Sequence, residues 1–317
     1  MGILNCKAMR EKHIEKLRNR EFEGKVSFIQ VGDNPASNTY VRNKIKLCQE
    51  LGIEVVHHTL SELTSQKFLI SIIEDMNNDE HIVGIMVQLP LPEHISEEAV
   101  INAIEPKKDI DGFTHVNKGK LMVGDPSGIV ACTPQGIMTI LNEINFDLKG
   151  KNVVIVGRSN IVGKQLAQLM INKGATVTVC NSSTNKTKLM CDIEASDLFI
   201  SAIGKANYFN KDFFKLCNLK YVTAIDVGIN RNSEGKLCGD IDKELYDEFK
   251  DVTSVPGGVG VMTVLEVIRN IFSQYACGKT VPEIIESMTA KGILHNGSPF
   301  KKTTLYKILQ NEQRRNN

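Results

Sequence analysis

The sequence predicts a two-domain α/β fold with a short helical appendage at its C-terminal end. Its 317 residues exceed the usual size of one domain and suit two. Helical and strand patterns alternate along the chain, which is typical of parallel sheets with crossover helices. A unit of strand, glycine turn, helix and strand begins near residue 152 and indicates that the second domain is Rossmann-like.

The expected elements follow from apolar periodicity and from turn residues. In the first half, apolar runs predict strands at 26–32, 53–60 and 82–92, and amphipathic patterns predict helices at 40–51 and 65–79. The block 105–136 is rich in Gly, Pro and Asp, so we expect an ordered connector there. In the second half we expect strands at 152–156, 175–180, 197–203 and 221–227, and helices at about 162–173 and 261–276.

The composition is that of an ordinary globular protein, with 42% hydrophobic and 24% charged residues. A net charge of +1 argues against nucleic acid or a membrane as a partner of the whole chain. The eight cysteines include no CxxC pair, so we expect no disulfide framework, no metal site and a reducing cytoplasmic location. The N-terminus lacks an apolar signal core, and no apolar run is long enough to span a membrane.

One lysine lies on the apolar side of the helix expected at 40–51. At 100° per residue, the other side collects the polar residues Arg42, Asn43, Lys46, Gln49 and Glu50. Lys44 instead lies among apolar residues, one turn after Tyr40. Burial would disfavour its charged form and provide a neutral amine that can accept a proton. The alternative is a lysine whose stem packs while its ammonium reaches water, and the helix pattern alone leaves both open.

Further polar residues stand where the expected strands end. Gln88 follows the buried part of the strand at 82–92, at the edge where open α/β sheets usually bind ligands. The loop KKDIDGF holds Asp109 and Asp111, and Asp111 precedes a glycine. Asp111 could bind a ligand amide or amidine through hydrogen bonds and charge, or it could serve only to form the turn.

The glycine turn of the second unit indicates a nucleotide site. Gly157 and Gly163 form a G-x5-G pattern, in which the first allows a tight turn and the second a close approach to a phosphate. The next strand ends in VCNSS and lacks the acid that usually binds an NAD ribose, while Arg158 and Ser159 stand in the turn. This combination favours the 2′-phosphate of NADP. A structural glycine turn with a solvated arginine is the alternative.

Eight motifs in sequence order resemble one enzyme family. They are VGDNPASNTYVRNKIKLCQELGI, VQLPLP, PKKDIDGF, CTPQG, VVIVGRSNIVGK, IDVGIN, GDID and SVPGGVGVMT. Together they resemble the bifunctional methylenetetrahydrofolate dehydrogenase/methenyltetrahydrofolate cyclohydrolase family over roughly residues 4–277. Because the motifs also keep a consistent spacing, the resemblance is highly specific.

The resemblance implies roles for individual residues. Tyr40, Lys44, Gln88 and Asp111 match the catalytic set, in which the glutamine hydrogen-bonds the lysine and the aspartate grips the pterin ring. Gly157, Arg158, Ser159, Ser182 and Ile229 match NADP-binding positions, with Ile229 beside the nicotinamide. Tyr40, Asp111, Pro256, Gly257, Gly260 and Thr263 match positions around the folate. No metal is implied.

The resemblance also implies a domain organisation and an assembly. Residues 1–130 with the helix 263–277 would form a folate-binding catalytic domain, and residues 131–262 an NADP-binding Rossmann-like domain. The partners implied are one-carbon derivatives of tetrahydrofolate, and a homodimer is expected.

The implied activity is a pair of consecutive reactions. NADP⁺ would oxidise 5,10-methylenetetrahydrofolate to the methenyl cation, and water would then add to give 10-formyltetrahydrofolate. A shikimate-type dehydrogenase is an alternative, but it would not explain Tyr40, Lys44, Gln88 and Asp111 together. A monofunctional NAD-dependent enzyme of the same family conflicts with this catalytic set and with Arg158.

Four positions depart from the pattern of the family. Gln165, Ala206 and Val261 stand where proline is usual, and Asn181 replaces a frequent histidine. Because proline restricts the backbone, we expect these changes to loosen the loops around the cofactor.

The tail, 279–317, predicts two short helices joined by the turn-rich link HNGSPFKK. Its sequence MTAKGILHNGSPFKKTTLYKILQNE resembles the DNA-binding helix-turn-helix end of large serine recombinases. The tail is too short to bury a core of its own, and no recombinase catalytic domain accompanies it. We therefore expect an appendage that is dispensable for catalysis, with DNA binding or assembly as the alternative for this segment.

Overall fold

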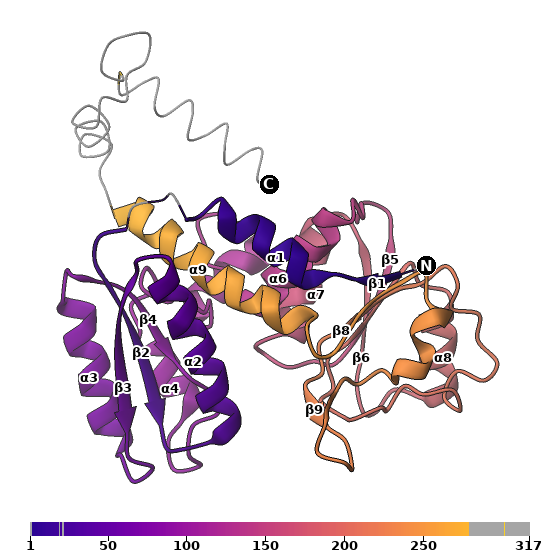
Figure 1. Ribbon diagram of the computed structural model, residues 1–317, viewed down its shortest axis with the longest axis horizontal. Coiled ribbons are helices and arrows are strands. Elements are labelled where there is room, and N and C mark those ends of the chain that lie inside the picture. Colours follow the sequence, from indigo (N-terminus) through magenta and orange to yellow (C-terminus); the bar gives the residue numbers. More distant parts are fainter. Residues whose placement is uncertain (1, 19, 21, 279–300, 302–317) are drawn as a thin grey trace.

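The computed structural model describes residues 2–18, 20, 22–278 and 301. Two parallel sheets lie apart along the long axis of the molecule, and helices run between them (Figure 1). The predicted α/β fold with two domains is therefore confirmed. The helix-turn-helix predicted for the tail lies outside the described residues.

The N-terminal sheet contains three parallel strands in the order β3-β2-β4. They are β2 (Lys25–Val31), β3 (Glu54–Leu60) and β4 (Ile82–Val87), and the helices are α2 (Pro35–Glu50), α3 (Gln66–Asn78) and α4 (Glu97–Asn102). Helix α2 begins earlier than expected, because the Asn34 side chain accepts a hydrogen bond from the Ser37 N–H and Pro35 suits the first turn. Its amphipathic pattern is as predicted: Arg42, Asn43, Lys46, Gln49 and Glu50 are exposed.

The prediction of a connector at 105–136 is wrong in one respect. This block contains α5 (His115–Val123) and the start of α6 (Cys132–Glu143). Thr114 caps α5 by accepting a hydrogen bond from the Asn117 N–H, and Gly124 ends it in a left-handed conformation at φ 72°. Cap residues and turn residues are the same types, so composition hid a helix of nine residues.

The second sheet has six parallel strands in the order β1-β11-β8-β7-β5-β6. Its central strands are β5 (Asn152–Val156), β6 (Thr176–Cys180), β7 (Leu198–Ser201) and β8 (Thr223–Asp226), close to the predicted positions. Helices α7 (Gly163–Asn172) and α8 (Lys186–Glu194) form the crossovers, and a short hairpin of β9 (Asn230–Arg231) and β10 (Leu237–Cys238) follows β8. The 3₁₀ helix η1 (Lys243–Glu248) precedes β11 (Asp251–Thr253).

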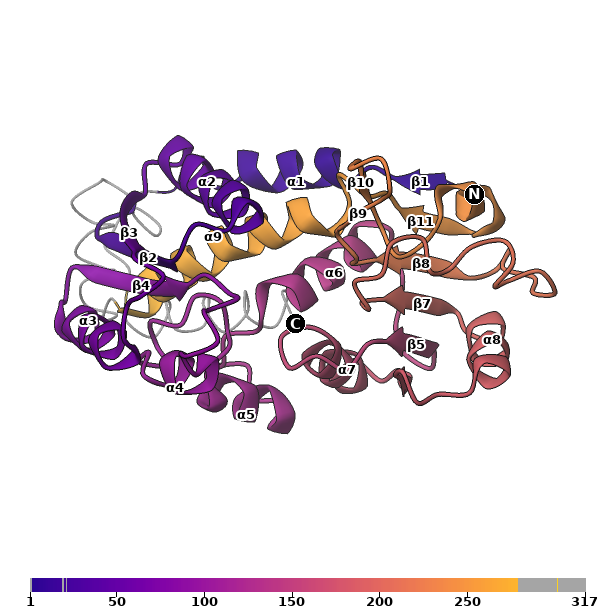
Figure 2. The same cartoon turned by 90° about the horizontal axis from the view of Figure 1, so that it is seen from below.

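Three helices join the two sheets. Helices α6 and α9 (Val259–Gly278) lie against each other between the sheets, and α1 (Cys6–Glu15) packs along α9 (Figure 2). Helix α9 also contacts α2 and β4, so the helix expected from Thr263 does return to the first domain.

The chain begins in the sheet of the second domain. Strand β1 (Gly2–Leu4) pairs with β11, with Ile3 opposite Val252. The boundaries predicted at 130 and 262 stay a prediction, and they did not include this pairing. A strand of three residues carries too little periodicity to be recognised in a sequence.

Candidate active site

A cleft of about 970 Å³ separates α2 from the loops that follow β8 and β11. Its lining includes five residues that the sequence assigned to the site: Tyr40, Ile229, Pro256, Gly257 and Gly260. Arg10, Lys46 and Arg231 add positive charge to its wall. A pocket at the carboxyl ends of parallel strands and between two domains is the usual place for a ligand in this class of fold.

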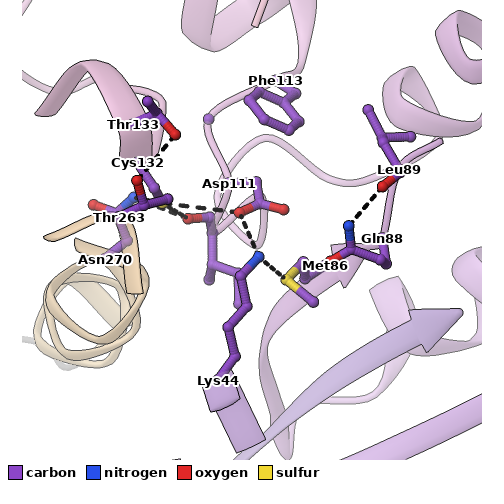
Figure 3. A network of polar contacts seen from close by, with 12 residues as sticks. Lys44, Met86, Gln88, Leu89, Asp111, Phe113, Cys132, Thr133, Thr263 and Asn270 are labelled. Atoms are coloured by element: carbon purple, nitrogen blue, oxygen red, sulfur yellow. Dashed lines mark hydrogen bonds and ion pairs between the residues drawn. The ribbon is translucent and has the colours of Figure 1, made fainter. Parts of the chain in front are cut away.

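Lys44 is buried in the first domain behind this cleft, with 4% of its surface exposed. Its Nζ lies 2.9 Å from the Met86 sulfur and 3.6 Å from Asp111 Oδ1 (Figure 3). The same Nζ lies 4.9 Å from the centre of the Tyr40 ring. The alternative in which the ammonium reaches water is therefore wrong. A thioether is a weak acceptor, so the carboxylate and the face of the ring provide most of the electrostatic stabilisation of the ammonium.

Asp111 is the anionic partner of Lys44. Burial raises the pKa of its carboxyl group, and the nearby Lys44 charge opposes that rise. Asp111 lies in a loop whose turn is formed by Asp109, not by Asp111 itself. The Asp109 carboxylate accepts hydrogen bonds from the backbone N–H groups of Gly112 (2.9 Å), Phe113 (3.2 Å) and Thr114 (2.8 Å). Asp111 is thus left to contact Lys44.

Lys108 fixes the same loop from the other side. Its ammonium donates to the carbonyl groups of Met76 (2.9 Å), Asn77 (2.8 Å) and Asp79 (2.7 Å) at the end of α3. Sequence reasoning gave no role to Lys108 or Asp109, because a charged loop is most often solvated. Their burial shows that they hold the backbone from which Asp111 projects.

Gln88 does not make the hydrogen bond with Lys44 that the resemblance implied. Its Nε2 donates to the neighbouring Leu89 carbonyl at 2.6 Å, and its buried Oε1 has no hydrogen-bond partner among the described residues. On β4 it is Met86, two residues earlier, that touches the Lys44 ammonium (Figure 3). Gln88 nevertheless follows the end of β4, as predicted.

Tyr40 connects the lysine to the start of α9. Burial raises the pKa of the Tyr40 hydroxyl, and a hydrogen bond with Thr263 lowers it. The Thr263 hydroxyl lies 3.1 Å from that of Thr133 and donates to the Val259 carbonyl at 3.2 Å. Residues from α2, α6 and α9 therefore meet at this point, where Tyr40 and Thr263 lie together.

Sequence reasoning missed two residues that contact the Asp111 loop. The Cys132 thiol lies 3.4 Å from the Ile110 carbonyl and 3.8 Å from Asp111 Oδ1, and burial raises its pKa so that it stays a donor. Asn270 Nδ2 donates to the Ile110 carbonyl at 2.9 Å. The signal for Asn270 was an amide within the apolar helix VMTVLEVIRNIF.

The cofactor turn, residues 157–163, requires both of its glycines. Gly157 has φ 131°, and a Cβ there would lie 2.3 Å from the Ala202 carbonyl oxygen. A Cβ on Gly163 would lie 2.1 Å from the Gly157 carbonyl oxygen. The close packing leaves a cradle of backbone at the N-terminus of α7, which suits a phosphate group.

The polar residues assigned to the cofactor lie at one edge of the second sheet. Val156 pairs with Cys180, so Arg158 and Ser182 each stand two residues beyond paired positions of β5 and β6. Both side chains are exposed. The Ser159 hydroxyl accepts from the N–H groups of Val162 (3.2 Å) and Gly163 (3.4 Å). This arrangement fits the phosphates of a dinucleotide, with a guanidinium beside them.

Asp240 and Asp226 are buried carboxylates that the sequence reasoning quoted in motifs without giving them roles. Asp240 accepts from Ser201 Oγ (2.8 Å), from the N–H groups of Ile203 (2.9 Å) and Lys205 (2.8 Å), and from Asn230 Nδ2 (2.9 Å). Asp226 accepts from the N–H groups of Gly228 and Asp240, both at 3.0 Å, and burial raises its pKa to about 7. The pair holds the loops after β7 and β8, and the second of these carries Ile229.

The described residues contain neither a group of metal ligands nor a membrane-spanning helix. Across residues 2–18, 20, 22–278 and 301, no three His, Cys, Asp or Glu side chains are grouped so that they could bind a metal. In the same part of the chain, no helix has the length and apolar character needed to cross a membrane.

Two family models match this chain in succession. The catalytic domain of tetrahydrofolate dehydrogenase/cyclohydrolase matches residues 4–111, and the NAD(P)-binding domain of the same enzymes matches residues 131–278. The bifunctional protein FolD of Agathobacter rectalis is 44% identical over 261 residues, which cover 82% of this chain and 91% of that protein. The chain belongs to the tetrahydrofolate dehydrogenase/cyclohydrolase family.

Further members of the family agree in sequence and in structure. FolD of Streptococcus thermophilus is 45% identical over 275 residues, or 85% of this chain and 93% of that protein. The structure of FolD from Campylobacter jejuni has a TM-score of 0.82 and 38% identity, covering 87% of this chain and 99% of that one. FolD from Trypanosoma brucei, complexed with NADP and an inhibitor, has a TM-score of 0.76 and 31% identity, covering 86% and 95%.

Membership confirms the predicted activities. The chain is an NADP-dependent methylenetetrahydrofolate dehydrogenase and a methenyltetrahydrofolate cyclohydrolase of one-carbon metabolism. A family model named Recombinase also matches residues 263–313. Only residues 263–278 and 301 of that stretch are described, and the former form most of α9, so the dispensable appendage stays a prediction for the tail, with DNA binding as its alternative.

Proposed function

We propose that the two reactions use different parts of one folate site, with Lys44 as the proton-transfer group of the hydrolysis. The observation that carries this proposal is the burial of the Lys44 ammonium against the Tyr40 ring and Asp111. Burying an ionic group in a low-dielectric site costs free energy that pairing offsets only in part. A position that needed only packing would therefore favour an apolar residue.

The oxidation depends on holding the nicotinamide against the one-carbon bridge of the folate. Bound NADP⁺ supplies a hydride acceptor for the one-carbon bridge of the folate. Gly157, Arg158, Ser159 and Ser182 hold its phosphates, and the exposed Ile229 lines the cleft near the nicotinamide. The Arg158 guanidinium selects the 2′-phosphate of NADP, since no acid follows β6 to bind a free ribose hydroxyl.

Hydrolysis requires a proton to leave water as it adds to the methenyl carbon. Lys44 accepts this proton, and the Tyr40 ring, whose centre lies 4.9 Å from Nζ, helps to hold the side chain in place. Asp111 binds the amidine-like edge of the pterin, while Pro256, Gly257 and Gly260 line the cleft. Thr263 supports this region through its hydrogen bond with Tyr40. Gln88 offers its unpartnered Oε1 to the bound folate as a hydrogen-bond acceptor.

Location and assembly complete the proposal. The enzyme works in the cytoplasm, which suits its eight cysteines without a CxxC pair. It forms a homodimer, as the resemblance to the family implies. Light scattering at micromolar concentration tests the assembly, and a monomer with full activity would remove the dimer from the proposal.

One assay tests the whole proposal. The protein is mixed with 5,10-methylenetetrahydrofolate and either NADP⁺ or NAD⁺, and the absorbance of reduced cofactor and of methenyl-folate is followed. We expect reduced cofactor to form faster with NADP⁺, and methenyl-folate to be converted further to 10-formyltetrahydrofolate. If methenyl-folate accumulates and is hydrolysed only at its spontaneous rate, the role of Lys44 is contradicted.

A further inference from the structure

One buried amide connects the cofactor turn with the folate side of the enzyme. Gln165, in the first turn of α7, has 4% of its surface exposed. Its Oε1 accepts a hydrogen bond from the Ala131 N–H at 3.3 Å, and its Nε2 donates to the Asn160 carbonyl at 3.1 Å. A single side chain therefore binds two backbone segments that lie about thirty residues apart along the chain.

Each of these segments leads to one half of the active site. Ala131 is fully buried and directly precedes Cys132, whose thiol contacts the Asp111 loop. Asn160 belongs to the cofactor turn and follows Arg158 and Ser159. The Gln165 amide therefore connects the two halves directly.

The sequence led us to expect the opposite effect from this residue. A glutamine in place of the usual proline was expected to loosen the turn, but the structure shows a side chain that restrains it. Burying an amide without partners is unfavourable, so a position that needed only packing would favour an apolar residue. Both hydrogen-bonding groups of Gln165 are instead satisfied by backbone.

We propose that Gln165 is a positioning residue that orders the cofactor turn and couples it to the folate half of the site. The inference rests on the proposed role of Arg158 and Ser159 in binding NADP. Without the amide, the Asn160 carbonyl and the Ala131 N–H lose their partner, and the turn samples other conformations. NADP⁺ must then order the turn as it binds, which weakens its binding and leaves the bound complex competent.

Gln165→Met tests this idea with Gln168→Met as the matched control. Methionine is similar in length but forms neither hydrogen bond. Gln168 follows Gln165 on α7 by less than one turn, and its side chain donates to Asn172. We expect Gln165→Met to raise the KM for NADP⁺ about fivefold, the effect of losing about one net hydrogen bond. Its kcat, and its hydrolysis of methenyl-folate without NADP⁺, should change less than about twofold.

Four results decide between the possibilities. An unchanged KM for NADP⁺ in Gln165→Met, or an equal rise in Gln168→Met, would overturn the inference. Equal loss of both reactions would assign Gln165 a general folding role and overturn it too. A smaller rise in melting temperature on adding NADP⁺ than wild type shows would support it even if the variant is less stable.

Arg158→Ala separates this inference from the proposed cofactor site. If Arg158→Ala reduces the preference for NADP⁺ while Gln165→Met leaves the KM unchanged, the cofactor site stands and the coupling by Gln165 is refuted. If neither variant affects NADP⁺, the assignment of the turn itself fails.

Discussion

Replacing Lys44 by methionine removes the ammonium and keeps a side chain of similar length. In wild type, that ammonium lies 3.6 Å from Asp111 Oδ1 and 4.9 Å from the centre of the Tyr40 ring. We expect Lys44→Met to abolish measurable hydrolysis of methenyl-folate while the fold and NADP⁺ binding persist. The Lys44 ammonium contacts Met86, Asp111 and Tyr40, and none of these belongs to the cofactor turn, so the geometry of that turn should not change.

Lys44→Met should have two separate effects, one on the rate of hydrolysis and one on the free energy of unfolding. A positioned general base contributes about 10²–10⁴-fold to a rate, or about 2.7–5.4 kcal/mol of the activation barrier. Leaving a buried carboxylate without its partner costs about 3–5 kcal/mol of folding free energy when the carboxylate stays charged. Asp111 can avoid much of that cost by binding a proton, because burial already raises its pKa.

The loss of stability in Lys44→Met depends on pH. In the variant, the pKa of Asp111 rises further, because the Lys44 charge that lowers it is gone. A folded-state pKa above the unfolded value gives stability that is lost as pH rises through the folded-state pKa. The stability deficit of Lys44→Met should therefore be smaller at low pH than at pH 8.

The assay follows the absorbance of methenyl-folate in the absence of cofactor, with denaturant melts at each pH. Arg42→Met on the exposed side of α2 is the control, since it removes a cation from the same helix. Hydrolysis by Lys44→Met at the wild-type rate would refute the role of Lys44 in proton transfer. Equal losses in Lys44→Met and Arg42→Met would refute the idea that the buried position matters.

Four other predictions test separate parts of the molecule. Arg158→Ala should narrow the preference for NADP⁺ over NAD⁺ by about 1.5–3 kcal/mol, and an unchanged ratio of kcat/KM values would contradict it. Asp111→Asn should weaken folate binding more than NADP⁺ binding in titrations, whereas equal losses would indicate a folding defect. Burial and the Arg269 guanidinium lower the pKa of His13, so its contribution to stability is lost as pH falls below about 6.5. In denaturant melts, the free energy of unfolding should fall more steeply with decreasing pH in wild type than in His13→Gln. Truncation after Gly278 should leave both activities within about threefold, under about 0.7 kcal/mol in the barrier, and an inactive but folded product would show that the tail completes the site or the assembly.

Local signals explain how much of the fold the sequence predicted. Apolar periodicity depends only on neighbours a few residues away, and it located β2–β8 and the core of α2, α3, α7 and α9. The same locality explains the errors. Helix α5 was hidden by its own caps, and β1 is too short to show a period and acquires its identity by pairing with β11.

For the site, the sequence determined which residues are chemically unusual. The sequence alone showed three features: a lysine in an apolar arc, a glycine turn without a following acid, and motifs in the order of the family. They predicted Tyr40, Lys44, Asp111 and the cofactor turn, and with them the enzyme family. Residue type and local spacing were sufficient because these features depend on helix geometry and on backbone sterics.

Only the tertiary structure decided which partners those residues have. Lys44 contacts Met86 where the resemblance implied Gln88, and Asp109 forms the turn that frees Asp111. Gln165, expected to loosen a loop, joins segments that lie far apart in the sequence. Partners of this kind are chosen when separate elements pack and every buried polar group must find a hydrogen bond, and no local pattern in the chain encodes that outcome.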